Sequence, residues 1–163
     1  MSNLYRTFKY LGSRVLPILF FCSSAYSEVT PKTSVQPSFR SDTTMQIRLD
    51  IEGQNPVTAT LDSSPATLDL MKQLPLTLKL KDYAGTEKIA YPPHKLSTEN
   101  SAKAYAGKAG DITYYAPWGN LAIFYKDSDA GLANGLIYLG KLASIPAAFS
   151  KSQKITVRIT EVK

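Results

Sequence analysis

The chain has 163 residues, of which 19 are basic and 13 acidic, giving a formal net charge of +6 at neutral pH. The basic residues are scattered, and no recognition motif accompanies them, so we expect no nucleic-acid partner. One histidine and one cysteine are too few for the usual zinc sites, which take three or four such ligands. We therefore expect neither a metal nor a cofactor.

The first 27 residues have the pattern of a signal peptide. Arg6, Lys9 and Arg14 form a positive region, and the short apolar run 15–22 (VLPILFFC) precedes the small residues of 23–27 (SSAYS), which suit cleavage. A membrane-spanning helix needs about 20 apolar residues, more than this run offers. The alternative is a disordered N-terminus with an accidental apolar patch. We expect export to the periplasm or the medium, with no stable membrane anchor after cleavage.

Cleavage of the signal peptide would change the cysteine content and the net charge of the chain. Cys22 lies inside the segment that cleavage removes, and Phe21 before it is too large for a lipoprotein signal, so we expect no thiol or disulfide in the mature chain. Processing also leaves 16 basic residues against 13 acidic ones, a net charge of +3. Residues 28–43 are polar and contain two prolines, which predicts a flexible arm.

The globular domain, residues 44–163, opens with a predicted β-hairpin. Apolar and polar residues alternate over 45–51 and again over 57–61, and the turn sequence 53–56 (GQNP) separates the two runs. A period of two predicts strands with one face in water. Two such strands around a short turn predict an antiparallel pair.

A short helix and a third strand follow. Ser64 suits the N-cap and Pro65 the first helical position, and Leu70, Met71 and Leu74 lie at helical spacing toward the core. Pro75 is expected to end the helix. The alternating run 76–80 predicts a strand, whereas 82–101 is expected to be irregular, with a turn at Ala84 and Gly85.

The second half of the domain also consists mainly of predicted strands. The runs are 112–115, 121–125, 136–142 and 155–159, with a polar loop over 127–135 and one helical turn over 145–149. At least six short strands in about 120 residues suit a single domain. We expect a mostly β fold, a small closed barrel with one or two short helices.

Five aromatic residues fall within the two predicted strands 112–115 and 121–125 and the loop that joins them. Tyr114 and Tyr115 should point to opposite faces of their strand, as should Phe124 and Tyr125. We expect one member of each pair in the core. Plain barrel packing with a surface tryptophan is one interpretation; the other is a ligand-binding groove lined by Tyr91, Tyr115 and Trp118.

No catalytic arrangement stands out. The single histidine, His94, has no neighbouring nucleophile in the sequence and is expected on a surface loop. Asp127, Ser128 and Asp129 resemble the start of a calcium loop, but the later positions depart from the EF-hand pattern. We interpret this segment as a solvated turn. Most acidic residues are expected on wet strand faces near Lys or Arg.

The segments 110–125 (GDITYYAPWGNLAIFY), 74–78 (LPLTL) and 135–141 (GLIYLGK) resemble the bacterial cyclophilin-like domain family. The resemblance extends from Met45 to Val162 and implies a small closed cyclophilin-like β-barrel. True cyclophilins carry a Phe-His-Arg motif, whose arginine polarises the prolyl amide, and a Gln-x-Phe element. Neither motif occurs here, and shared fold does not carry activity across.

We therefore expect an exported, non-catalytic binding module for a small apolar ligand or an extended peptide. A divergent peptidyl-prolyl isomerase is the enzyme alternative. The third possibility is a structural or interaction protein that docks through the 127–135 loop or through a sheet edge.

Overall fold

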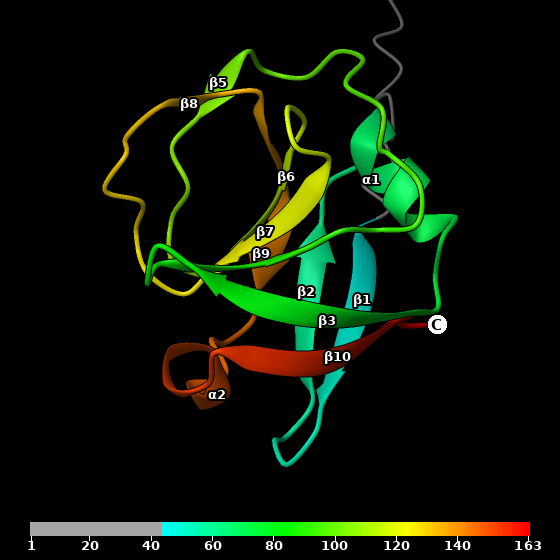
Figure 1. Cartoon of the computed structure of the whole chain (residues 1–163). Coiled ribbons are helices and arrows are strands. Elements are labelled where there is room, and N and C mark those ends of the chain that lie inside the picture. The colour runs from blue at the N-terminus through cyan, green and yellow to red at the C-terminus, as the bar shows by residue number, and fades with distance from the viewer. Residues whose placement is uncertain (1–43) are drawn as a thin grey trace, which may run out of the picture. The chain divides into compact units, whose positions relative to one another are not determined.

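A computed structural model describes residues 44–163, so the predicted signal peptide (1–27), the arm (28–43) and Cys22 lie outside the described residues. Figure 1 shows the arrangement of the elements. In chain order they are β1 (Met45–Ile51), β2 (Val57–Leu61), α1 (Pro65–Met71), β3 (Leu76–Tyr83), β4 (Glu87–Ala90), β5 (Ala104–Tyr105), β6 (Asp111–Tyr115), β7 (Asn120–Phe124), β8 (Ala133–Asn134), β9 (Leu136–Leu142), α2 (Ala147–Lys151) and β10 (Lys154–Glu161).

Eight of these strands form a closed antiparallel barrel, as predicted. The order around it is β1-β10-β3-β4-β7-β6-β9-β2, and β2 pairs with β1 to complete the circle. Closure leaves no open edge in the barrel, so the sheet edge considered above as a docking surface is not available there. The remaining strands, β5 and β8, form a separate two-stranded sheet.

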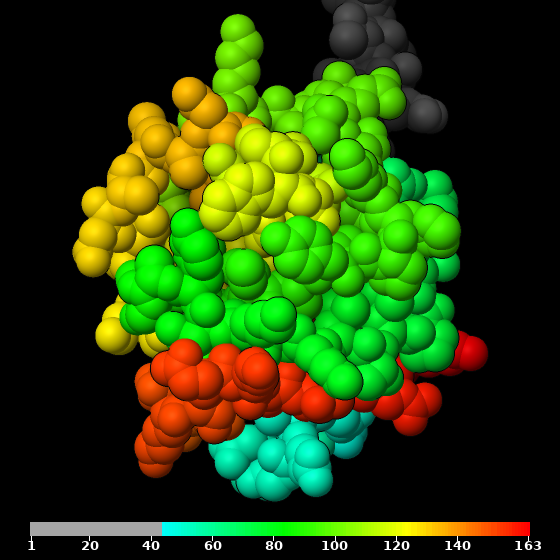
Figure 2. All heavy atoms as spheres, viewed as in Figure 1, coloured from blue at the N-terminus to red at the C-terminus, as the bar shows by residue number. Residues whose placement is uncertain are grey.

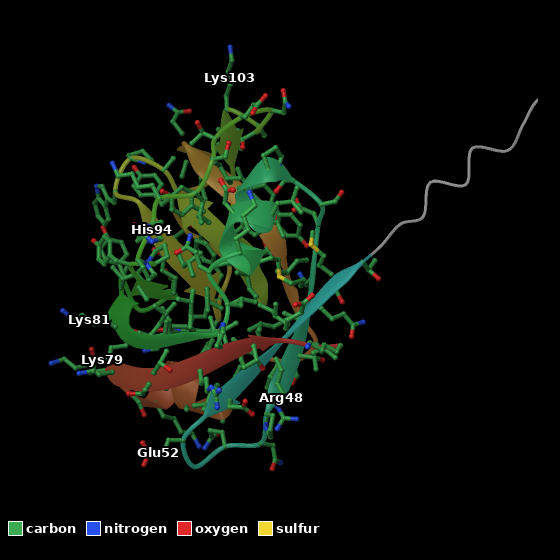
Figure 3. All side chains as sticks on the ribbon, turned by 90° about the vertical axis from the view of Figure 1, so that its right-hand side faces the viewer. Arg48, Glu52, Lys79, Lys81, His94 and Lys103 are labelled. Carbon is green, nitrogen blue, oxygen red and sulfur yellow. The ribbon has the colours of Figure 1, made fainter. Side chains whose placement is uncertain are left out.

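Period-two alternation accounts for the interior of the barrel. In β1, β2, β3 and β10 every second residue is buried, while residues between them, such as Arg48, Lys79 and Lys81, are exposed (Figure 3). In β6, β7 and β9 consecutive residues are buried, because their outer face is covered as well. Figure 1 shows α1 and α2 at opposite ends of the barrel, where Leu70 and Phe149 join the core. The strand residues of this core include Ile47, Leu49, Ile51, Val57, Leu61, Leu78, Leu80, Ile112, Tyr114, Leu121, Ile123, Leu139, Ile155, Val157 and Ile159.

Helix α1 begins as predicted but ends earlier. The Ser64 hydroxyl accepts a hydrogen bond from the backbone N–H of Thr67 at 3.3 Å, which is the N-cap interaction. The helix ends at Met71, before Pro75, because tighter backbone turns at Gln73 and Leu74 follow it. Leu70 is buried in the core, as expected.

The prediction of an irregular segment over 82–101 is wrong in part. The turn at Ala84 and Gly85 is confirmed, both residues having positive φ, and it connects β3 to β4 as a hairpin. The strand β4 escaped prediction because its inward-facing residues are Lys88, only 1% exposed, and the small Ala90. With a lysine at an interior position, β4 lacks the apolar–polar alternation that predicts the other strands.

The other expectations for the second half hold with small shifts. The strand 136–142 is confirmed as β9, and the helical turn is α2, which begins just after Pro146. The polar loop 127–135 contains the short strand β8, which pairs with β5. Among the described residues no helix is long and apolar enough to cross a membrane.

Candidate functional site

A second apolar cluster lies on the outer face of the barrel. It contains Ala122, Phe124 and Leu136, with Tyr105 and Tyr115 among the partly buried residues packed against it. Because neighbouring strand residues point to opposite faces, Tyr114 lies in the main core and Tyr115 in this outer cluster. Phe124 and Tyr125 divide in the same way. The predicted splitting of both aromatic pairs is confirmed.

The outer cluster forms the floor of a pocket of about 270 Å³. Its walls come from the β3–β4 turn, the β6–β7 turn and the loop before β8, coloured green, yellow and yellow-orange on the face shown in Figure 2. The lining residues are Tyr83, Ala84, Thr86, Glu87, Tyr115, Trp118, Asn120, Phe124, Ser128, Asp129, Ala130, Ala133 and Leu136.

Three aromatic rings meet at the pocket wall. The ring centroid of Trp118 lies 5.4 Å from that of Tyr83, with an angle of 87° between the planes, and 5.4 Å from that of Tyr115, with an angle of 79°. Such edge-to-face contacts follow the quadrupoles of the rings. Trp118 is 49% exposed and Tyr83 42%, so both rings keep a free surface for a ligand.

Glu87 supplies a carboxyl group to the same pocket. It is the first residue of β4, and the strand alternation that turns Lys88 inward directs Glu87 outward. No hydrogen bond or ion pair joins its carboxyl to another residue of the part of the chain described. Burial raises the pKa of Glu87 to about 7, because the charged form is poorly solvated there.

Asn120 adds a buried amide at the base of the pocket. The residue is 1% exposed, and its side-chain N–H donates to the carbonyl of Leu121 at 3.0 Å. Its Oδ1 atom has no hydrogen-bond partner among the described residues. A buried acceptor without a partner is uncommon in folded proteins, and a donor on a bound molecule or water would satisfy it.

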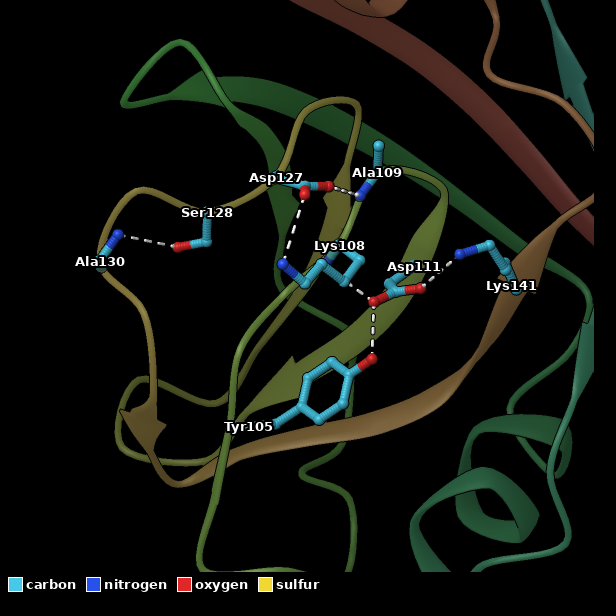
Figure 4. A network of polar contacts seen from close by, with 8 residues as sticks. All are labelled: Tyr105, Lys108, Ala109, Asp111, Asp127, Ser128, Ala130 and Lys141. Atoms are coloured by element: carbon cyan, nitrogen blue, oxygen red, sulfur yellow. Dashed lines mark hydrogen bonds and ion pairs between the residues drawn. The ribbon is translucent and has the colours of Figure 1, made fainter.

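A polar network fixes the loop that carries Ser128 to Ala130 (Figure 4). The carboxylate of Asp127 accepts hydrogen bonds from the Ala109 backbone N–H at 2.9 Å and from Lys108 Nζ at 3.3 Å. These two hydrogen bonds hold the pKa of Asp127 below its ordinary value. The predicted solvated turn at Asp127 is thus an exposed, hydrogen-bonded one.

Asp111 is the buried centre of the same network. Its carboxylate accepts hydrogen bonds from the hydroxyl of Tyr105 at 2.8 Å and the backbone N–H of Lys108 at 2.8 Å, and pairs with Lys141 Nζ at 3.2 Å. Burial, together with the hydrogen bond to Asp111, raises the pKa of Tyr105 to about 12. The network therefore fixes the segment from Tyr105 to Ala109 and the loop after Asp127 beside the outer cluster.

The structure brings together two of the three predicted ligand residues. Tyr115 and Trp118 line the pocket, whereas Tyr91 is 59% exposed and is not among the lining residues. His94 is exposed on a loop, as expected. In the described part of the chain no three His, Cys, Asp or Glu residues are grouped to hold a metal ion.

Sequence reasoning missed Tyr83, Glu87 and Asn120. Most acidic residues were expected on wet faces beside basic ones, and Glu87 is an exception: it is partly buried without such a partner among the described residues. The available signal was the Ala84-Gly85 turn, part of a three-residue hairpin loop between Tyr83 and Glu87. Recognising that hairpin would have placed both residues on one sheet.

A closed eight-stranded antiparallel barrel with a pocket on its outer face defines the class of protein, and comparison with known proteins agrees. The model of the cyclophilin-like family matches residues 49–160, which include every residue of the pocket and all of the barrel except the first four residues of β1 and the last residue of β10. The chain therefore belongs to the cyclophilin-like family, as its sequence motifs implied.

A solved structure supports the fold. The hypothetical protein AF2241 from Archaeoglobus fulgidus, whose solution structure is known, matches with a TM-score of 0.59 and 17% sequence identity. The match covers 76% of this chain and 99% of that protein. At this identity the likeness concerns the fold alone. No curated protein matches the sequence.

Proposed function

We propose that this protein is a binding module whose ligand, a small molecule with an apolar part or a segment of an extended peptide, occupies the outer pocket. The observation that carries the proposal is the meeting of Tyr83, Tyr115 and Trp118 around one cavity that also contains Glu87. Ligand sites are typically concave and apolar, with a few placed polar groups. At about 270 Å³, this pocket suits a small molecule or one or two peptide side chains.

The residues of the pocket favour binding over prolyl isomerisation. Its thirteen lining residues include no arginine, the residue that polarises the prolyl amide in true cyclophilins. They also include no histidine or cysteine to serve as a nucleophile or its base. Ring surfaces with a polar handle are instead typical of recognition sites.

A screen with the chain's own fluorophore tests the proposal. Trp118 is the sole tryptophan, so a ligand in the pocket changes the fluorescence directly. Neutral aliphatic and aromatic fragments and short peptides are screened by thermal shift, and hits are titrated against the fluorescence. We expect hits that raise the melting temperature of the wild-type chain.

Two variants locate such hits. Trp118→Ala is expected to abolish the thermal shift of a hit, and Tyr91→Ala, at an exposed aromatic outside the pocket, measures whether the third predicted residue contributes. Trp118→Ala should cost only about 1–2 kcal/mol of stability, since the ring is half exposed. A screen with no hit in any class would favour a structural or interaction role and overturn the proposal.

Export of the mature chain is a separate part of the proposed function. It rests on the positive region, apolar run and small residues of positions 1–27. When the full chain is expressed in a bacterial host, we expect a product in the periplasm or medium that begins after Ala25 or Ser27. An intact N-terminus on cytoplasmic protein, measured by mass spectrometry, would contradict export.

A further inference from the structure

The charges around the pocket have one sign. Glu87 and Asp129 are the only Asp, Glu, Lys or Arg residues in the pocket lining, and both are acidic. This contrasts with the chain as a whole, whose basic residues outnumber its acidic ones by six. Acidic residues in the pocket of a chain with a positive net charge favour a cationic ligand at this place.

The rings add a second attraction for positive charge. Tyr83 and Tyr115 stand nearly perpendicular to the indole plane of Trp118, at 87° and 79°. The three rings, in different orientations, therefore border the same pocket. A cation within about 6 Å of such ring faces is attracted by their quadrupoles, and cages of this kind recognise alkylated ammonium groups.

Glu87 is the group most in need of a charged partner. Its carboxyl has no hydrogen-bonding or ion-pairing residue in the described chain, and burial keeps its pKa at about 7. A cation that enters the pocket would stabilise the ionised form, because an opposite charge nearby offsets desolvation. A neutral or anionic ligand would provide no such compensation.

We propose that the pocket is a cage for an alkylammonium ion, whose charged nitrogen lies among the rings of Tyr83, Tyr115 and Trp118 and beside the Glu87 carboxylate. This inference rests on the proposed function and specifies its ligand. A quaternary trimethylammonium group fits best, because ring faces and a counter-charge are enough to bind it, and a hydroxyl elsewhere in the same ligand can donate to the unpartnered Asn120 Oδ1. A bare metal ion does not fit, since the described residues offer no group of three ligating side chains.

Choline and its neutral isostere, 3,3-dimethylbutan-1-ol, test the proposal by separating charge from shape. Both are titrated against Trp118 fluorescence at pH 8, where Glu87 is mostly ionised. We expect choline to bind at least about tenfold more tightly than the alcohol, a difference within the range of a desolvated cation–ring contact. A peptide bearing trimethyllysine carries the same head group; tighter binding than choline assigns the group to a peptide, and equal binding to a free small molecule.

Substitutions of single acidic residues test whether the Glu87 carboxylate causes the preference for choline over the alcohol. Glu87→Gln should lower choline affinity about tenfold and leave the alcohol's affinity unchanged, which also verifies that the variant is folded. Glu52→Gln removes the same charge at an exposed position in the β1–β2 turn, outside the pocket, and should change neither affinity. Asp129→Asn, on the exposed rim, should have a smaller effect because solvent screens its charge.

The outcomes separate this inference from the proposed function. Equal affinities for choline and the alcohol would overturn the cation cage while leaving a ligand pocket in place. An unchanged affinity of Glu87→Gln for choline would also overturn it. If neither compound alters the fluorescence, the cage is overturned, and the fragment and peptide screen alone decides whether the pocket binds any ligand.

Discussion

Glu87 and Phe124 are direct partners across the β4–β7 ladder, and both side chains line the outer pocket. Opposed residues of an antiparallel pair have Cβ atoms about 5 Å apart on the same face. The carboxyl therefore lies beside the apolar cluster around Phe124, which is 2% exposed. That placement accounts for the desolvation that raises the pKa of Glu87 to about 7.

The raised pKa makes the stability of the free protein depend on pH. Between the ordinary carboxyl value of 4.5 and about 7, the folded state holds a proton that the unfolded state has lost. The free energy of unfolding contributed by Glu87 is therefore full below about 4.5 and falls as the pH rises through about 7. Glu87→Gln removes this dependence, so we expect it to be more stable than the wild type at pH 8.

Chemical denaturation of both proteins at several pH values measures the effect. The difference between them isolates Glu87 from the other ionisable groups of the pocket, Tyr83, Tyr115 and Asp129, which both proteins share. A stability difference that stays constant from pH 4 to pH 8 would contradict the assignment.

Gly107 controls the position of the pocket floor. A Cβ added at this residue would lie 2.4 Å from ring carbons of Phe124, so Gly107→Ala must displace the ring. We expect a loss of about 1–3 kcal/mol, the usual cost of overpacking, and altered Trp118 fluorescence. The measurement is denaturant unfolding.

A second substitution tests the cause of that loss. Phe124→Leu shortens the side chain that meets the added methyl group, so the double variant should lose less stability than the two single losses combined. Strict additivity would show that Gly107 matters for another reason, such as the loop backbone around it.

Lys88 is the buried counterpart of Glu87 inside the barrel. Its Nζ donates to Asp82 Oδ1 at 2.7 Å and to the carbonyl of Ser152. Burial alone raises the pKa of Asp82, but hydrogen bonds from Lys88 and Tyr125 outweigh it and hold that pKa below its ordinary value. Lys88→Met breaks a buried ion pair and should cost about 3 kcal/mol.

Thermal and denaturant unfolding measure the loss, with Asp82→Asn added to form a double-mutant cycle. Because removing both charges leaves no unpaired carboxylate, we expect the double variant to be more stable than Lys88→Met alone. A loss below about 1 kcal/mol for Lys88→Met would contradict a stabilising role of the buried pair.

Prolyl isomerisation is expected to be absent, because the pocket lacks an arginine to polarise the amide. In a protease-coupled assay on the mature chain, we expect the uncatalysed rate at micromolar protein. Acceleration that is lost in Trp118→Ala would overturn the non-catalytic assignment and place an isomerase in this pocket.

The barrel was predictable because most of its strands follow simple alternation. The runs from Met45 to Ile51 and from Ile155 to Ile159 bury every second residue, so one-dimensional pattern and three-dimensional burial coincide. β4 breaks the rule through Lys88, whose interior position depends on Asp82 and on a carbonyl 64 residues away. Local sequence does not reveal such a partner.

The candidate site was predictable only in its aromatic half. Tyr115 and Trp118 stand out by composition within one hairpin, whereas Glu87 reaches them only through the β4–β7 pairing. Tyr91 was chosen as an aromatic residue upstream of that hairpin, yet the structure leaves it outside the pocket lining. Lateral strand order, which alternation does not encode, decides which residues share a pocket.

The most direct test of the pocket as the ligand site is a nuclear magnetic resonance titration of the isotopically labelled chain with choline. We predict that backbone amide shifts concentrate at Thr86, Glu87, Trp118 and Ser128, which lie on the three segments around the cavity. Shifts confined to residues elsewhere, such as Lys79 and Ile155 on the β3–β10 side, would contradict the account.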